Sequence, residues 1–257
     1  LIGGVAKKYQ DGVAVEIPVP DSVKDQIAPV KKMIDESVAE TSEELMNKYF
    51  DGIPFTKEEI MKAFRGGIAS GEITPVLCGS AMRLSGVDDL LDIIVDFFPS
   101  PDECPAEKVG DIEVKANESD PLAAIVFKTI ADPFVGKMSF FKVESGTMKA
   151  ESTVMNARTG QPEKIGKLYY LRGKKQIETA SITAGDLGVV TKLSSVKTGD
   201  TLCASSRVVN LERIEFPKPC LSLAVEPQTK GDEEKISSGL TRLMEEDPTF
   251  KVETNRE

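Results

Sequence analysis

Residues 122–146 read LAAIVFKTIADPFVGKMSFFKVESG, and this stretch decides the fold class of the middle of the chain. Two apolar segments, 122–127 and 137–144, have the length and the two-residue period of β-strands, and a Ser-Gly turn signal follows them. Turn signals recur at roughly 8–12-residue spacing, which is typical of a β-barrel or a β-sandwich. Further strands are predicted near 152–156, 164–170, 176–180, 186–193 and 200–203, with turns at Thr159-Gly160, Ala184-Gly185 and Thr198-Gly199.

The sequence before this region predicts helices. An extended start at 13–17 stops at Pro18 and Pro20, and apolar residues then recur every three or four positions up to Asp51-Gly52. Asp21-Ser22 is expected to cap this first helix. A second helix is expected from Thr56, with Glu59 completing a capping box, and it should end at Gly66-Gly67. A strand at 73–78 and a helix from Val87 to Phe98 are expected to follow. Pro99, Pro101 and Pro105 then predict a stiff connection and a domain boundary.

The sequence after the β-rich region predicts the beginning of an α+β domain. Pro217 and Pro219 mark the boundary, and 220–226 reads as a strand. Asp232 is expected to cap a helix with apolar residues every three or four positions, and a second strand is expected at 250–252.

Composition bounds the class of protein. The chain has 257 residues, of which 40% are hydrophobic and 29% charged, as expected for a soluble protein of two or three domains. No apolar run is long enough to span a membrane, and the chain begins at Leu1 without an initiator Met, which we interpret as a truncation. Four cysteines without a C-x-x-C pair, and no histidine, predict a reduced cytoplasmic protein with no metal site and no histidine base.

The net charge of −10 is unevenly distributed. Residues 111–213 carry 15 basic and 12 acidic side chains, whereas both flanking regions are net acidic. Only this middle region could lie comfortably on a polyanion. It contains a basic cluster that is either a solvated hairpin or a set of phosphate contacts: Lys164, Lys167, Arg172, Lys174 and Lys175.

Two short motifs bear on nucleotide binding. Ser80-Ala81-Met82 follows the predicted strand at 73–78, and in GTPases a Ser-Ala turn at this place contacts the guanine edge through backbone N–H groups. A phosphate loop of the form G-x-x-x-x-G-K-[ST] is absent from the sequence, so nothing in it would hold phosphates or Mg²⁺. Thr229-Lys230-Gly231-Asp232 matches a guanine-reading pattern but comes after the Ser-Ala turn, and we interpret it as a helix cap.

These motifs together resemble the elongation factor G family of translational GTPases. The run 73–81, with Gly86-Val87 and 97–101, is similar to the end of the family's nucleotide domain. The segments 132–137, 145–146, 184–186 and 198–202 resemble its second domain, and 225–230 with 245–250 resemble the start of its third.

The resemblance implies a multi-domain α+β fold. Residues 1–104 would be the C-terminal part of an α/β GTPase domain with a helical insert at 1–71, residues 105–213 a translation-factor β-barrel, and residues 214–257 a truncated ferredoxin-like domain. It implies a monomeric fragment, no membrane partner, and ribosome binding through contact of the barrel with small-subunit RNA. The whole protein would hydrolyse GTP with Mg²⁺ and promote translocation, but this chain would hold no catalytic residue, no cofactor and, of the nucleotide site, only Ser80, Ala81 and Met82.

Two departures from the family pattern suggest a paralogous branch. Arg83-Leu84-Ser85 replaces Lys-Asn-Lys, and 171–176 replaces a loop that often contains histidine. Ribosomal-protection and release-factor relatives share the same scaffold, and a non-enzymatic ribosome- or RNA-binding protein is a further alternative. A second face of the barrel, near Asp132 to Lys137 and Lys142, is the alternative RNA contact.

Overall fold

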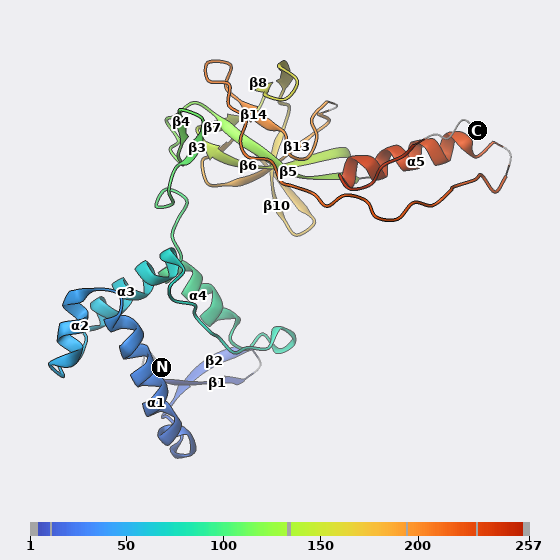
Figure 1. The fold of residues 1–257 in the computed structure, drawn as a ribbon. Coiled ribbons are helices and arrows are strands. Elements are labelled where there is room, and N and C mark those ends of the chain that lie inside the picture. The colour runs from blue at the N-terminus through green and yellow to red at the C-terminus, as the bar shows by residue number, and fades with distance from the viewer. Residues whose placement is uncertain (1–4, 11, 133–134, 194, 230, 254–257) are drawn as a thin grey trace. The chain divides into compact units, whose positions relative to one another are not determined.

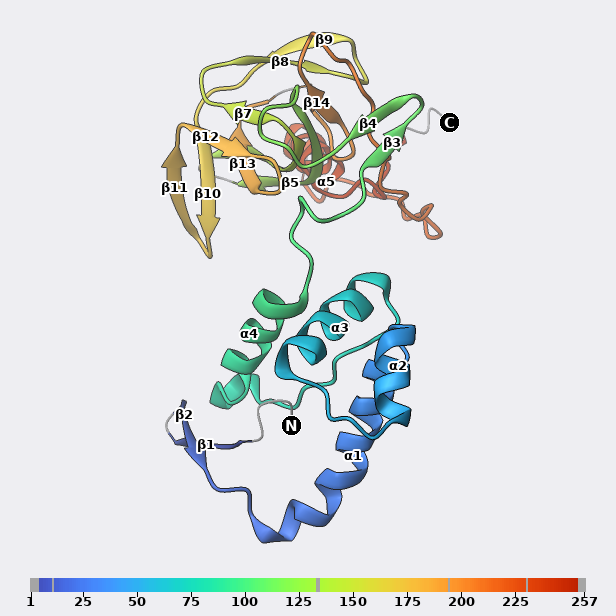
Figure 2. The same ribbon diagram turned by 90° about the vertical axis from the view of Figure 1, so that its left-hand side faces the viewer.

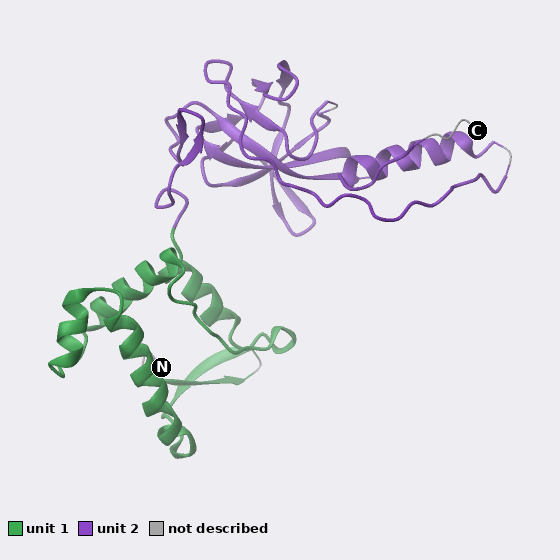
Figure 3. Ribbon diagram, viewed as in Figure 1, with its two compact units in different colours: residues 1–99 green, residues 100–257 purple. Residues whose placement is uncertain are grey.

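The structure is a computed structural model that describes residues 5–10, 12–132, 135–193, 195–229 and 231–253. The chain divides into two compact units, residues 1–99 and residues 100–257, which are coloured separately in Figure 3. The predicted boundary at 104/105 stays a prediction. The start at residues 1–4, residues 133–134 of the second-domain motif, and Lys230 lie outside the described residues.

The first unit is a small helical body with one β-hairpin (Figure 1). Its hydrophobic core is formed by Val38, Ala63, Phe64 and Phe97, which bring three of its helices together. Its elements are β1 (Ala6–Gln10), β2 (Val13–Ile17), α1 (Asp21–Ala39), α2 (Glu43–Phe50), α3 (Lys57–Ser70), a short 3₁₀ turn (Ala81–Arg83) and α4 (Val87–Phe97).

The start of α3 agrees with the sequence prediction, and its end does not. The Thr56 side chain accepts from the Glu59 N–H and the Glu59 carboxylate accepts from the Thr56 N–H, so the capping box is confirmed. The helix continues through Gly66-Gly67 and stops at Gly71, which has φ +80°. Gly67 is a packing residue, because a Cβ there would lie 2.6 Å from the Ile73 side chain.

The long helix predicted before Asp51 is two helices. Ser42 has an extended backbone and accepts a hydrogen bond from the Leu45 N–H, so it caps the start of α2 and separates it from α1. The expected Asp21-Ser22 cap is wrong, since Pro20 occupies the cap position and makes no side-chain bond. Pro fits next to the first turn because the N–H groups there have no helical partner.

The strand predicted at 73–78 is also wrong. In the described chain these residues belong to no strand, and Val76 is 89% exposed. A β-strand is stabilised by its hydrogen-bonded neighbours, and no described segment of the first unit pairs with this one. The α/β character of this unit therefore stays a proposal.

The second unit is dominated by an antiparallel sheet of eight strands in the order β11-β10-β13-β6-β5-β14-β8-β9 (Figure 2). The other described strands of this unit form two short antiparallel pairs, β3 with β4 and β7 with β12. The strands are β3 (Glu107–Val109), β4 (Ile112–Val114), β5 (Ala123–Asp132), β6 (Gly136–Ser145), β7 (Thr147–Lys149), β8 (Thr153–Asn156), β9 (Gln161–Lys164), β10 (Leu168–Arg172), β11 (Lys175–Thr179), β12 (Ser181–Thr183), β13 (Leu187–Thr191) and β14 (Thr201–Cys203).

The sheet curls around one hydrophobic core. Val154 from β8 and Leu168 from β10 come from opposite ends of the strand order, yet both belong to the same buried cluster as Val126, Phe141 and Leu202. This curvature around a shared core agrees with the barrel interpretation of the sequence, and β11 and β9 are the two edge strands of the curved sheet. The segment predicted as one strand at 164–170 contains the end of β9 and the start of β10, and the three-residue strands β3, β4, β7 and β12 were not predicted.

The C-terminal part of the second unit contains helix α5 (Glu233–Glu246). Residues 220–226 and 250–252 form no strand in the described chain, so both strand predictions are wrong, and no partner strand is present among these residues. The ferredoxin-like arrangement is therefore not seen. None of the described helices combines the length and the hydropathy that crossing a bilayer requires.

Candidate nucleic-acid interface

The predicted guanine-edge residues lie on a tight turn in the first unit. The Ser80 N–H donates to the Ser85 carbonyl at 2.8 Å, and the Ser85 N–H donates back to the Ser80 carbonyl at 3.1 Å. Two glycines allow this close approach, since a Cβ at Gly79 would lie 2.8 Å from the Ser85 oxygen and one at Gly86 would lie 2.7 Å from the Cys78 oxygen. The turn is therefore set by its own backbone.

A cavity of about 320 Å³ lies against this turn. It is lined by residues 77–81, 85–87 and Leu90, and none of these side chains is charged. Ser80 and Ala81 line it, whereas Met82 is 96% exposed and does not. The lining suits a flat, weakly polar group such as the edge of a base, and it offers phosphates no cation.

The basic cluster predicted in the second unit does not form one patch. Lys164 ends β9 and Arg172 ends β10, and Figure 2 shows the β8–β9 hairpin and the β10–β11 hairpin on different sides of the unit. Lys167 pairs with Glu178 at 2.8 Å, and this contact raises the pKa of its ammonium. Only Arg172, Lys174 and Lys175 remain together.

These three residues occupy the end of the β10–β11 hairpin, which we call the hairpin tip (Arg172, Lys174 and Lys175). Arg172 pairs with Lys175 in the register, so Gly173 and Lys174 form a two-residue loop. Gly173 has φ +61°, as the first position of a tight hairpin turn requires. All three side chains are exposed, and no ion-pair partner for them is found in the part of the chain that the structure describes.

The base of this hairpin is held in place by a tyrosine. Tyr170 donates its hydroxyl proton to Asp186 at 3.0 Å, which ties β10 to the loop before β13. Burial, together with this bond to a carboxylate, raises the pKa of Tyr170. The strand that leads to the hairpin tip is therefore tied to the sheet by a side-chain bond as well as by its backbone pairing.

The alternative face, near Asp132 to Lys137, is already occupied by acidic side chains. The Lys137 ammonium lies 3.6 Å from a Glu245 oxygen of α5, and its side chain is only 12% exposed. Lys142 lies 3.0 Å from Glu144. Sequence reasoning missed the first pair, because Glu245 and Lys137 are far apart in the chain.

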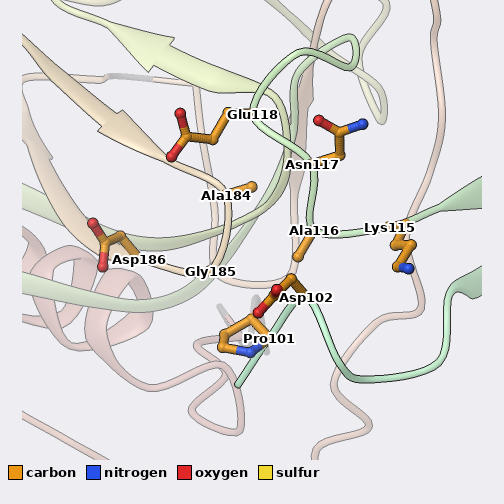
Figure 4. Close-up of a pocket in the computed structure, with 9 residues that line it drawn as sticks. All are labelled: Pro101, Asp102, Lys115, Ala116, Asn117, Glu118, Ala184, Gly185 and Asp186. Carbon is orange, nitrogen blue, oxygen red and sulfur yellow. The ribbon is translucent and has the colours of Figure 1, made fainter. Parts of the chain in front are cut away.

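A second and larger cavity, about 640 Å³, lies on the second unit (Figure 4). Figure 4 shows three carboxylates around it, from Asp102, Glu118 and Asp186, and one cation, Lys115. No three acidic or cysteine side chains among the described residues are grouped closely enough to hold a metal ion. An excess of carboxylates disfavours phosphate, so this cavity is not part of a nucleic-acid interface.

A buried polar network connects the β8–β9 turn to the loop before β14. Asp200 is 2% exposed and accepts bonds from Arg158 Nε at 2.6 Å, Arg158 Nη2 at 2.9 Å, Asn156 Nδ2 at 2.9 Å and the Lys197 N–H at 2.9 Å. Burial alone would raise the pKa of this carboxyl, but the donors outweigh it and the pKa is lowered. The Gly-Asp-Thr turn was visible in the sequence, but its partner Arg158 was not.

The Thr229–Asp232 motif is held by its own side chains. Asp232 stands at the cap position of α5, but its carboxylate makes no cap bond and instead accepts from the Thr229 hydroxyl and from Lys235. The cap position is confirmed and the cap bond is not. The same two contacts lower the pKa of Asp232.

Comparison with known proteins identifies similar domains. The family model for elongation factor G domain 2 matches residues 121–205, and the model for elongation factor G domain III matches residues 216–257. A crystal structure of a protein from Thermus thermophilus is 29% identical, with a TM-score of 0.81. The match covers 99% of this chain and 37% of that one, so this chain spans little more than a third of the length of the Thermus protein.

Proposed function

Since the chain belongs to the elongation factor G family of translation factors, we propose that it is part of a ribosome-associated GTPase. We further propose that its second unit contacts ribosomal RNA of the small subunit through the hairpin tip. The observation that carries this proposal is the exposed group of Arg172, Lys174 and Lys175 on a domain of this family. Cations without a carboxylate partner are available to neutralise phosphates.

The whole protein would bind GTP with Mg²⁺, hydrolyse it to GDP and phosphate in the cytoplasm, and promote translocation. Ribosomal protection, a release-factor activity and a non-enzymatic ribosome-binding role are the alternatives. The reading frame upstream of Leu1 separates enzyme from non-enzyme. A phosphate-loop sequence there supports the GTPase, and a natural start at this point without one would exclude it.

The tip is tested by charge reversal. We expect Lys174→Glu with Lys175→Glu to weaken binding to the small ribosomal subunit more than tenfold, because each lost phosphate contact removes about 0.7–0.9 from the slope of log affinity against log salt. Two lost contacts reduce the slope by about 1.4–1.8. Binding is measured by sedimentation at several salt concentrations.

The matched control is Lys31→Glu with Lys62→Glu, which changes the net charge equally at exposed positions on α1 and α3. This control should leave the salt slope unchanged. If both double variants weaken binding equally, only the net charge matters and the tip assignment is wrong.

A second prediction concerns nucleotide affinity. We expect this chain to bind a fluorescent GDP analogue more weakly than a dissociation constant of about 1 mM, because the Ser80 cavity has no cation for the phosphates, which supply most of the binding. Fluorescence anisotropy measures this. Micromolar binding, which corresponds to about −8 kcal/mol, would contradict the assignment of this cavity as a base-edge contact alone.

A further inference from the structure

Helix α5 is held on the second unit by two adjacent glutamates at its C-terminal end. Glu246 Oε1 accepts from the backbone N–H of Ala131 at 2.6 Å, and Glu245 lies 3.6 Å from the Lys137 ammonium. Ala131 and Lys137 are paired near the end of the β5–β6 hairpin. Figure 1 shows α5 at this far end of β5.

The two contacts use groups that a phosphate would also use. Along 128–132, β5 pairs with β6 on one side, and β14 pairs only with residues 123–125 on the other. The N–H of Ala131 therefore points to an open sheet edge, and Glu246 satisfies it. The backbone N–H of Lys192 donates to the Lys137 carbonyl, so the backbones of these two residues are adjacent, and Lys192 is exposed. The carboxylate pair of α5 thus occupies a backbone donor and a cation, and a further exposed lysine follows the neighbouring strand β13.

The placement of these acids is unfavourable for the helix itself. A helix C-terminus carries a partial negative charge and prefers cations in its last turn. The last turn of α5 contains Glu245 and Glu246 and no basic residue. The contacts with Lys137 and Ala131 offset this cost only while the helix is docked.

The docking is also shallow. No residue of α5 is buried, and within the described chain the one element with which it makes extensive contact is β5. Residues 212–229, which lead to the helix, are exposed and lie in no helix or strand. A helix that has no buried residue and is held by two polar contacts at one end is ready to dissociate without unfolding the sheet.

We propose that α5 is a releasable cover over a second polyanion-binding surface, formed by the Ala131 N–H, Lys137 and Lys192. The carboxylates of Glu245 and Glu246 stand where phosphates would bind, and RNA competes with them. This inference rests on the proposed contact of the second unit with RNA, but it does not use the hairpin tip. It also accounts for the two candidate RNA-binding faces, because the hairpin tip is exposed and the face near Asp132 to Lys137 is covered by α5.

The test compares Glu245→Ala with Glu246→Ala against a matched pair, Glu215→Ala with Glu226→Ala. Both pairs remove two negative charges, and Glu215 and Glu226 lie exposed in the segment before α5. Alanine favours helix, so α5 itself is preserved, as circular dichroism verifies. Hydrogen exchange of the Ala131 amide reports on docking, and binding of a single-stranded RNA homopolymer at several salt concentrations reports on the surface.

We expect the Glu245/Glu246 variant to exchange the Ala131 amide about tenfold faster, since a hydrogen bond to a charged group is lost. Its RNA salt slope should steepen by about 0.7 for each further phosphate that the uncovered surface neutralises, relative to the control. Adding Lys137→Ala should reverse that steepening. The proposal would be overturned by an unchanged exchange rate of the Ala131 amide. It would also be overturned by faster exchange of this amide with an RNA salt slope equal to that of the control.

The outcome is separable from that of the hairpin tip. The Lys174/Lys175 variant is measured in parallel with Glu245 and Glu246 intact. If the Lys174/Lys175 variant loses binding and the Glu245/Glu246 variant has no effect, the proposed function stands and the proposal that α5 is a cover is wrong. An effect of the α5 variant that Lys137→Ala abolishes supports the cover whatever the hairpin-tip variant shows.

Discussion

Arg158→Ala should lower the free energy of unfolding of the second unit by about 3 kcal/mol, because it leaves the Asp200 carboxylate buried without its main partner. Breaking a buried ion pair costs about 3–5 kcal/mol, and we expect the lower end because the Arg158 side chain is 30% exposed. For a unit of this size the midpoint of thermal unfolding falls by about 6–12 °C. Calorimetry of the intact chain measures it.

The control is Arg172→Ala, the same change at the exposed hairpin tip, which should alter stability by less than about 0.5 kcal/mol. Equal effects of the two changes would show that the Asp200 network does not contribute to stability beyond an ordinary surface arginine.

The pH dependence of the free energy of unfolding has a definite sign. Because the folded state lowers the pKa of Asp200, its contribution is present above the unfolded pKa of about 3.9 and is lost as the pH falls through the folded value. Arg158→Ala should therefore flatten the acid limb of the stability curve.

Gly146→Ala should be at least as destabilising, by more than about 3 kcal/mol. Gly146 follows β6 with φ +73°, and an added Cβ would lie 2.5 Å from the Asp120 carbonyl oxygen and 2.7 Å from Leu122 Cα. These are backbone atoms, so no side chain can rotate away. The collision would separate the start of β5 from the end of β6, and chemical denaturation of the second unit measures the loss.

Gly160→Ala is the matched control, because Gly160 has φ +65° and nothing within 4 Å of the added Cβ. It should cost only about 1–2 kcal/mol for the left-handed backbone. The difference between the two variants isolates the steric term. A Gly146→Ala protein no less stable than Gly160→Ala would contradict the close packing of residues 120–122 against this turn.

The sequence predicts local structure well wherever the cause is local. The capping box at Thr56 and Glu59, the turns at glycines with positive φ, and the main strands of the second unit follow from spacing and residue type alone. The end of α3 was predicted four residues early, because Gly67 looks like a stop signal and is in fact a contact with Ile73. Only the folded packing distinguishes the two roles.

The predictions that failed depended on a distant partner. Residues 73–78 and 220–226 have strand-like sequences, but a strand exists only where a neighbour pairs with it, and neither has one among the described residues. The predicted basic cluster was judged by closeness in sequence, but Lys164 and Arg172 lie on two different hairpins that point to different sides of the unit. Arg158 with Asp200, and Glu245 with Lys137, are contacts between side chains far apart in the chain, which no spacing rule reveals.

The exposed segment at 212–229 sets the effective concentration of α5 near its docking strand. It follows Leu211, whose N–H donates to the Thr201 hydroxyl, and leads toward α5. A short connection without regular structure keeps the helix near its docking strand at an effective concentration on the order of millimolar. A contact too weak to survive between separate molecules is then still populated. A competitor with one phosphate must reach similar concentrations to displace the helix, whereas an RNA that binds the hairpin tip at the same time is itself held nearby and competes on equal terms.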